Sequence, residues 1–305
     1  MDWFFIALLG PLCWSIVPHL DKFLLNKLKK NHGIGSVMIF SCLFPVVLLP
    51  IFALIRPDVL SLSVGTIFAL TITGVVGALA ALFYFHALED EEASVIVSMY
   101  QLLPIFGYIL GFLVLGEEVG ITKTIGSLVI IMGATILSFD FFEEARPKFK
   151  TKMVLFMIGA SFCYALGDVI FKQTTLETSG YVPSIFWSFV GFVVFGILLF
   201  ILVPKYRKDF LLGLKTRGRT LLGVNIANEV LQSTATMATF YAILLAPIAL
   251  VLTLDAYQPA FVFIIGILLT IYFPKLVTEK ITTNHLLQKI VAITAVILGT
   301  ILIHL

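Results

Sequence analysis

Charged residues are scarce in this chain. Asp, Glu, Lys and Arg make up 12% of its 305 residues, against about 25% in a typical soluble domain. Hydrophobic residues make up 60%, and the mean hydropathy is +1.07. These values exclude an ordinary water-soluble fold. The 20 basic residues balance 18 acidic ones and do not gather into a surface that could follow a phosphate backbone, so we do not expect a nucleic-acid partner.

Cysteine is rare, and the familiar catalytic motifs are missing. Cys13, Cys42 and Cys163 lie in apolar runs, with no CxxC spacing and no neighbouring His. We interpret them as small buried hydrophobic residues rather than redox or metal-binding groups. The patterns HExxH, GxxxxGK[ST] and GxSxG do not occur, and no two His have metal-ligand spacing. We therefore predict no enzyme activity, no metal and no cofactor.

Apolar runs of membrane-spanning length, in contrast, are abundant. A helix needs roughly 20 apolar residues to cross the hydrocarbon core of a bilayer. The runs predict ten helices, over 3–20, 34–55, 64–88, 93–115, 124–139, 153–171, 182–203, 221–245, 247–273 and 286–305. The loops between them, including 205–219, are too short to bury a core of their own. The predicted fold class is an all-α, multi-pass membrane protein.

The basic residues predict how these helices cross the membrane. The loops after the first, fifth, seventh and ninth predicted helices carry 17 Lys and Arg, whereas the opposite side carries only Arg56, Lys123 and Lys172. The positive-inside rule places the basic side in the cytoplasm. We therefore predict a protein of the inner (cytoplasmic) membrane with both termini on the non-cytoplasmic side.

The two halves of the chain repeat each other. Pairs that match at offsets of 150 or 155 residues include Trp14 and Tyr164, Lys22 and Lys172, and Pro104 and Pro259. Because five helices per copy is an odd number, the second copy enters the membrane in the opposite sense, as in the inverted repeats of secondary transporters. We predict a first repeat over 1–142, a charged cytoplasmic linker over 143–152 and a second repeat over 153–305.

A set of short motifs runs through both halves. They are Ala87-Leu88, Ala93-Ser94, Pro104, Leu115-Gly116-Glu117-Glu118, Gly126 and Gly133, echoed by Pro259, Glu279 and Gly299. This set resembles the repeat signature of the EamA-type drug/metabolite transporters, and the resemblance covers essentially the whole chain. It implies a ten-helix member of that superfamily with two inverted five-helix repeats. It also implies a central cavity lined by helices 1–4 and 6–9, with helices 5 and 10 at the periphery.

Polar side chains at membrane depth are the candidate substrate-binding residues, because each is costly to insert. Along 221–245, Asn225, Asn228, Glu229 and Gln232 share one helix face. Interhelical hydrogen bonding by amides is one explanation, but it rarely needs a carboxylate, so we interpret this face as cavity lining. The other candidate substrate-binding residues are Trp14, Gln101, Tyr164, Asp255, Tyr257 and Gln258.

Two lysines occupy equivalent places in the repeats, each with a carboxylate nearby in sequence. Asp21 precedes Lys22, and Asp168 lies four residues before Lys172. Two interpretations are open. Each Lys is a locally paired side chain at a helix end, or Lys22, Asp168 and Lys172 hold anionic groups or take part in gating.

These features predict a secondary transporter, expected to export a small polar or amphipathic metabolite by alternating access. The alternative is a flippase for a lipid-linked or phosphorylated carrier, whose head group Lys22 and Lys172 would bind. As a coupling hypothesis, Glu229 and Asp255 exchange a proton for substrate; otherwise a static partner such as Lys172 holds each of them. The expected partners are the substrate and the lipid bilayer, with the protein a monomer or a homodimer.

Overall fold

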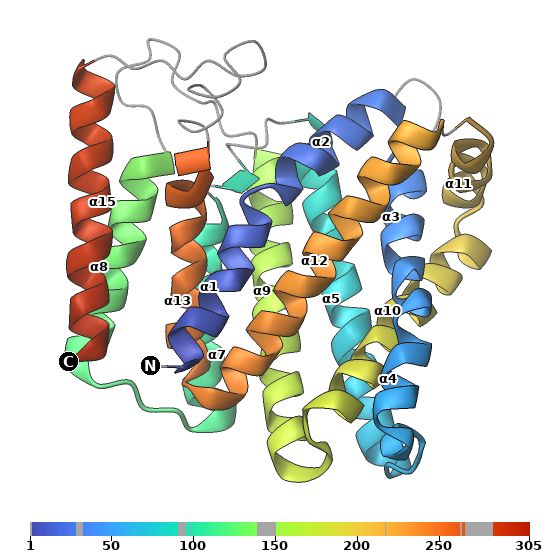
Figure 1. The fold of residues 1–305 in the computed structure, drawn as a ribbon, viewed down its shortest axis with the longest axis horizontal. Helices are drawn as coiled ribbons and strands as arrows, with labels where there is room; N and C mark the ends of the chain where they lie inside the picture. Colours follow the sequence, from blue (N-terminus) through green and yellow to red (C-terminus); the bar gives the residue numbers. More distant parts are fainter. Residues whose placement is uncertain are drawn as a thin grey trace.

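The computed structural model describes residues 2–28, 33–90, 96–97, 99–138, 151–216, 218–262, 264–265 and 283–305. Within these ranges every regular element is a helix. Figure 1 shows the helices running side by side between two ends of a bundle, with both chain termini at the same, lower end. The predicted all-α class is confirmed.

The helices of the first half include several that are broken by short turns. Their bounds are α1 Asp2–Trp14, α2 Val17–Leu28, α3 Gly33–Leu43, η1 Phe44–Val47, α4 Leu49–Ile55, η2 Pro57–Leu60, α5 Val64–Asp90, η3 Tyr100–Leu102, α7 Leu103–Leu115 and α8 Ile121–Ser138. The η labels mark 3-10 turns here. The predicted helix 34–55 is thus α3, η1 and α4 in succession.

The second half begins two residues earlier than predicted, inside the linker assigned to 143–152. Its elements are α9 Thr151–Thr174, η4 Thr175–Ser179, α10 Tyr181–Leu202, α11 Pro204–Thr216, α12 Arg219–Leu245, α13 Ile248–Thr253, η5 Leu254–Tyr257 and α15 Thr283–His304. The rest of the linker, 143–150, lies outside the described residues.

Several of these helices are suited to a bilayer. Five described segments are long and apolar enough to cross it: Trp3–Lys27, Gly33–Ile55, Val64–Glu89, Thr151–Glu177 and Tyr181–Leu202. Shorter apolar helices cover Tyr100–Leu115, Ile121–Leu137, Ile248–Val262 and Ile290–His304. The chain is therefore a multi-pass membrane protein. That all ten predicted helices cross the membrane, in two inverted repeats, stays a prediction.

Pro18 divides the first predicted helix, 3–20, into α1 and α2. A proline has no N–H and cannot bond to the carbonyl four residues earlier, here that of Trp14. The chain turns at Ser15 and Ile16, and the Trp14 carbonyl accepts a 2.5 Å hydrogen bond from Nε2 of Gln258 instead. The break thus joins α1 to a residue more than 200 positions away.

Pro104 and Pro259 produce a second pair of breaks. The turn η3 immediately precedes Leu103 and Pro104, and η5 immediately precedes Gln258 and Pro259, because neither proline can continue the α-helical bonding of the preceding residues. The two turns are in contact with each other. Irregular backbone from the two halves therefore meets inside the bundle, where protein groups can satisfy it.

The segment 205–219, predicted as a loop, is largely the helix α11. Pro204 stands at its start, where a proline is well tolerated. Tyr206 and Phe210, one turn apart, pack against the hydrophobic core beside α3, whereas Lys205 and Lys208 are exposed. The segment was predicted as a loop because many of its residues are charged, but it forms an amphipathic helix with a narrow apolar face.

Helices α5 and α10 touch backbone to backbone. A Cβ atom at Gly74 would lie 1.8 Å from the carbonyl oxygen of Ser188, and one at Gly191 would lie 2.1 Å from that of Thr71. No residue with a side chain fits at either glycine without moving the backbone. Close approach through small residues is a common way for helices to associate in a membrane.

Helices α8 and α15 form a separate pair at the left edge of Figure 1. They too meet at glycines, since a Cβ atom at Gly126 would lie 2.8 Å from the carbonyl oxygen of Gly299. Both glycines belong to the motif set that resembles the EamA signature. Their role in the fold is to bring these two helices together.

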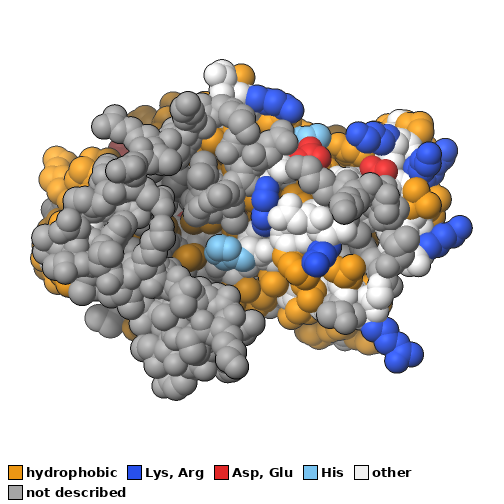
Figure 2. Space-filling model, turned by 90° about the horizontal axis from the view of Figure 1, so that it is seen from above, with side chains coloured by type: hydrophobic (Ala, Val, Ile, Leu, Met, Phe, Trp, Pro, Cys, Tyr) orange, Lys and Arg blue, Asp and Glu red, His pale blue; other side chains and the backbone are white. Residues whose placement is uncertain are grey.

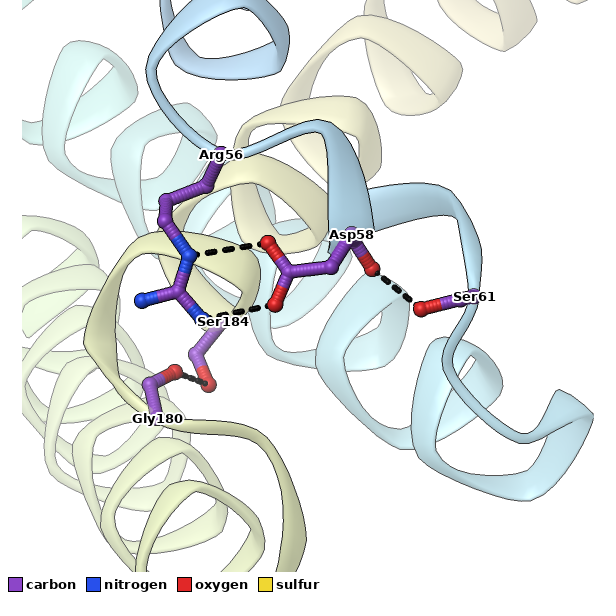
Figure 3. A network of polar contacts seen from close by, with 5 residues as sticks. All are labelled: Arg56, Asp58, Ser61, Gly180 and Ser184. Atoms are coloured by element: carbon purple, nitrogen blue, oxygen red, sulfur yellow. Dashed lines mark hydrogen bonds and ion pairs between the residues drawn. The ribbon is translucent and has the colours of Figure 1, made fainter.

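The two ends of the bundle differ in charge. Figure 2 shows the upper end, where Lys and Arg side chains gather. At the lower end, which η2 reaches in Figure 1, Arg56 donates hydrogen bonds of 2.8 and 2.6 Å to Asp58 (Figure 3). These hydrogen bonds lower the pKa of the Asp58 carboxyl. One end of the bundle is therefore rich in basic residues, and its assignment to the cytoplasm stays a prediction.

Candidate functional site

The helices enclose a cavity of about 150 Å³. Its walls come from α1, α2, α3, α5, α7, α9, α10, α12 and α13, together with residues in or next to the turns η1, η3 and η5. Within the described ranges, neither α8 nor α15 contributes a lining residue. These two helices correspond to the fifth and tenth predicted helices, which the family resemblance places at the periphery.

Aromatic rings form much of the wall. The ring of Tyr100 lies between those of Tyr84 and Tyr164, with centroid distances of 5.9 and 6.5 Å. We call these three residues the tyrosine wall. The other aromatic lining residues are Trp14, Phe85, Phe189, Phe192 and Phe240. Such surfaces can pack against an apolar or flat ligand and can attract a cation to a ring face.

Carboxylates are the charged groups of this cavity. Asp21, Asp168, Glu229 and Asp255 line it, and no Lys, Arg or His does so in the part of the chain that the structure describes. Unlike charges attract strongly where water is scarce, and like charges repel. The lining therefore favours a positively charged ligand over an anionic one.

Two of the four carboxylates are held by neighbouring side chains. The Tyr84 hydroxyl and the Asn228 amide donate hydrogen bonds of 2.9 and 2.7 Å to the two oxygens of Asp21. The Ser41 hydroxyl donates to an oxygen of Glu229. These bonds tie α2 to α5 and α12, and α3 to α12.

Asp255 is placed differently. It is only 6% exposed, and its Oδ2 atom has no hydrogen-bond partner. Asp168 lines the same cavity. Buried polar atoms normally have a partner, and a carboxylate oxygen accepts hydrogen bonds. The pair is therefore suited to a ligand that brings donors and positive charge.

Trp14 is fixed from both sides. Its indole Nε1 donates a 2.9 Å hydrogen bond to Oε1 of Gln232, and its carbonyl accepts the bond from Gln258. All three residues line the cavity. The indole is thus a positioned part of the wall between α1 and α12.

The assembled geometry is that of a cavity between membrane helices, and sequence comparison finds a family match over the first part of the chain. Residues 1–139 match the EamA-like transporter family. Over these residues the match confirms the resemblance seen in the motif set, and it suggests a membrane transporter of the drug/metabolite type. Ala93, Ser94 and Glu279 of that set lie outside the described residues. The match is consistent with the prediction that the protein is not an enzyme.

The fold is also found in a solved structure. A crystal structure of a protein aligns with a TM-score of 0.61, over 99% of this chain and 98% of that chain. The two sequences are 14% identical, so the likeness concerns the fold alone. No curated protein matches this chain in sequence.

Most of the predicted substrate-binding residues of this EamA-like chain come together at the cavity. The lining includes Trp14, Tyr164, Asn228, Glu229, Gln232, Asp255 and Gln258. It does not include Gln101, which is buried in η3, or Asn225, which is fully buried in α12. The hydroxyl of Tyr257 instead bonds to that of Thr300 on α15. Substrate contact by any of these residues stays a prediction.

The matched lysines have equivalent contacts outside the cavity lining. Nζ of Lys22 donates to the carbonyls of Leu88 and Glu89, near the end of α5, at 2.6 and 3.2 Å. Nζ of Lys172 donates to the carbonyl of Ala246, just after α12, at 2.7 Å. The C-terminal end of a helix carries partial negative charge. Each lysine therefore stabilises the end of a helix from its own half.

Glu117 of the EamA-like motif has a structural role next to the site that sequence reasoning missed. Its carboxylate lies 2.5 Å from Nζ of Lys172, and its second oxygen accepts a 2.8 Å bond from the backbone N–H of Ile248. The sequence placed Asp168 beside Lys172, but the ion pair is with Glu117, because Asp168 faces the cavity. The end of α7 is thereby fastened to α9 and α13.

Proposed function

We propose that this protein is a secondary transporter for small amphipathic organic cations, exporting them across the cytoplasmic membrane by alternating access of two inverted repeats. The observation that carries this proposal is the charge of the cavity lining, which holds four carboxylates and, within the described ranges, no basic side chain. A neutral metabolite would not compensate the charge of any of these carboxyl groups in its ionised form. A cation would, and it would gain from every carboxylate nearby.

The aromatic lining supports the amphipathic part of this proposal. The tyrosine wall and Trp14 offer an apolar surface with electron-rich ring faces beside the carboxylates. Ring faces attract ammonium groups, and more strongly when water is excluded. Ligand sites of this kind combine a mainly apolar lining with a few fixed polar groups.

The flippase alternative has less support. A phosphorylated carrier needs cationic groups for its head group, and Lys22 and Lys172 were the candidates. Both contact helix-end carbonyls, and Lys172 also pairs with Glu117. A phosphate entering the cavity would face four carboxylates, which would repel it.

Proton coupling through Glu229 and Asp255 remains part of the proposal. One static partner considered for both was Lys172, but its ion pair is with Glu117; the other was a backbone donor. Glu229 accepts from Ser41, a neutral group, and a hydroxyl can also accept from a protonated acid. Transport driven by a proton gradient, compared between wild type and Glu229→Gln or Asp255→Asn, tests this. Wild-type pH dependence in both variants would remove the coupling role.

A charge-matched substrate panel tests the function itself. Proteoliposomes are loaded in turn with 2-phenylethylamine, 2-phenylethanol and 3-phenylpropionate, which share a phenyl group and differ in charge, and release is compared with protein-free liposomes. We expect protein-dependent release of the amine and none of the acid. Release of the acid alone, or translocation of a fluorescent phospholipid without amine transport, would contradict the proposal.

A further inference from the structure

The four cavity carboxylates are not equivalent, and their hydrogen bonds distinguish two pairs. Asp21 receives donors from Tyr84 and Asn228, and the donors to Glu229 include Ser41. In the described structure no side-chain donor reaches Asp168, and Oδ2 of the almost fully buried Asp255 has none either. A ligand therefore has most to gain at Asp168 and Asp255.

We infer that the substrate carries a primary ammonium group, and that Asp168 and Asp255 together hold it. The inference rests on the proposed transport of organic cations and names the group that is recognised. Asp168 comes from α9 and Asp255 from η5, and both line the cavity. An ammonium placed between them donates to a buried oxygen and offsets the repulsion between two negative charges.

The hydrogen-bonding capacity of the site selects a primary ammonium over other cations. A primary ammonium has three N–H donors, which suit Oδ2 of Asp255, a carboxylate oxygen of Asp168 and a further acceptor. A quaternary ammonium has none, so it would leave the buried oxygen without a partner, at a cost in binding. No three metal-ligand side chains converge anywhere in the described ranges, so a chelated divalent ion is a poorer fit.

The apolar part of the substrate has a defined place beside these carboxylates. Tyr164 lies about one turn before Asp168 on α9, and Tyr100 lies in η3, which contacts the turn η5 that holds Asp255. At the other end of the wall, the Tyr84 hydroxyl donates to Asp21. The tyrosine wall therefore extends from the ammonium site towards Asp21, and the hydrophobic body of the substrate lies along it.

Calorimetry on the purified full-length protein in nanodiscs tests the inference. The probes are 2-phenylethylamine, 2-phenylethanol and (2-phenylethyl)trimethylammonium. We expect wild type to bind the primary amine about 10- to 100-fold more tightly than the alcohol, as befits hydrogen bonds to charged groups. We also expect it to prefer the primary amine to the quaternary one.

Variants locate the preference. Asp168→Asn and Asp255→Asn should each reduce the preference for amine over alcohol by about tenfold or more, while alcohol affinity, which reports an intact cavity, stays unchanged. Asp168→Glu should retain most of the preference. Glu177→Gln removes an exposed carboxylate of η4 and serves as the matched control.

The outcomes separate the inference from the proposed function. If wild type binds neither amine, that result contradicts the proposed function as well as the inference. Suppose that wild type binds amines but that the preference for amine over alcohol is unchanged in both Asn variants, or is abolished by Asp21→Asn instead. Either result overturns the inference alone. A tighter complex with the quaternary amine also overturns it. If both Asn variants fail to fold, the affinities of wild type for the three probes still test whether a primary ammonium is preferred.

Discussion

Breaking the ion pair between Lys172 and Glu117 should cost much of the stability of the fold. The two side chains are 8% and 15% exposed and lie 2.5 Å apart. Lys172→Met leaves the Glu117 carboxylate buried without its countercharge, and Glu117→Gln does the converse. Removing one partner of a buried pair destabilises a protein by about 3 to 5 kcal/mol.

The expected size of the effect can be expressed as a melting temperature. A change of 1 kcal/mol shifts Tm by about 2 °C in a large domain, so each single variant should melt about 6 to 10 °C below wild type. The double variant Lys172→Met with Glu117→Gln has no unpaired charge. Its loss of Tm should therefore be smaller than the sum of the losses in the two single variants. Thermal unfolding of the detergent-purified proteins measures all three.

The exposed pair of Arg56 and Asp58 provides the control. It has equally short contacts (Figure 3), but its side chains are 53% and 48% exposed, and surface ion pairs contribute little. Asp58→Asn should therefore leave Tm unchanged within error. Single variants of Lys172 and Glu117 that melt with wild type, or a double variant whose loss equals the sum, would refute the reasoning from burial.

Three further predictions follow from the packing and the charge distribution. Gly74→Ala should prevent correct folding, seen as aggregation in size-exclusion chromatography, because its Cβ would meet backbone, whereas Gly223→Ala, with open space around it, should elute as wild type. Trp14→Phe removes the donor to the Gln232 side chain and should lower the free energy of unfolding by about 1 kcal/mol, measured by denaturant titration in micelles. In a cysteine-free background, a Cys replacing the exposed Lys208 should react with an impermeant maleimide only after permeabilisation. A Cys replacing Asp58 should react in intact cells. The reverse pattern would show that the predicted orientation is wrong.

Local sequence patterns predicted much of the helix content and the polar face of α12. Asn228, Glu229 and Gln232 recur at helical spacing, and that spacing fixes a shared face wherever the helix lies. The same pattern also included Asn225, which is buried outside the cavity lining. Periodicity identifies the polar side of a helix, but the neighbours along its length decide which residues reach a cavity.

Partners distant in sequence could not be predicted. Such contacts, as between Glu117 and Lys172 or between Trp14 and Gln258, form only after the helices have packed. The sequence alone offers many acidic and amide side chains as possible partners for each of these residues. The nearest carboxylate to Lys172 along the chain, Asp168, lies about one turn away and still faces the cavity. Proximity in sequence was therefore a poor guide to ion pairing.

The glycine contact between α5 and α10 constrains how this transporter can move. The two helices come from opposite halves of the chain, yet their backbones touch at Gly74 and Gly191. Pulling them apart would lose the close van der Waals packing that the two glycines allow. We therefore expect α5 of the first half and α10 of the second half to move together. For the proposed alternating access, we then expect hinges within the halves, at breaks such as those before Pro18, Pro104 and Pro259, rather than at the boundary between the halves.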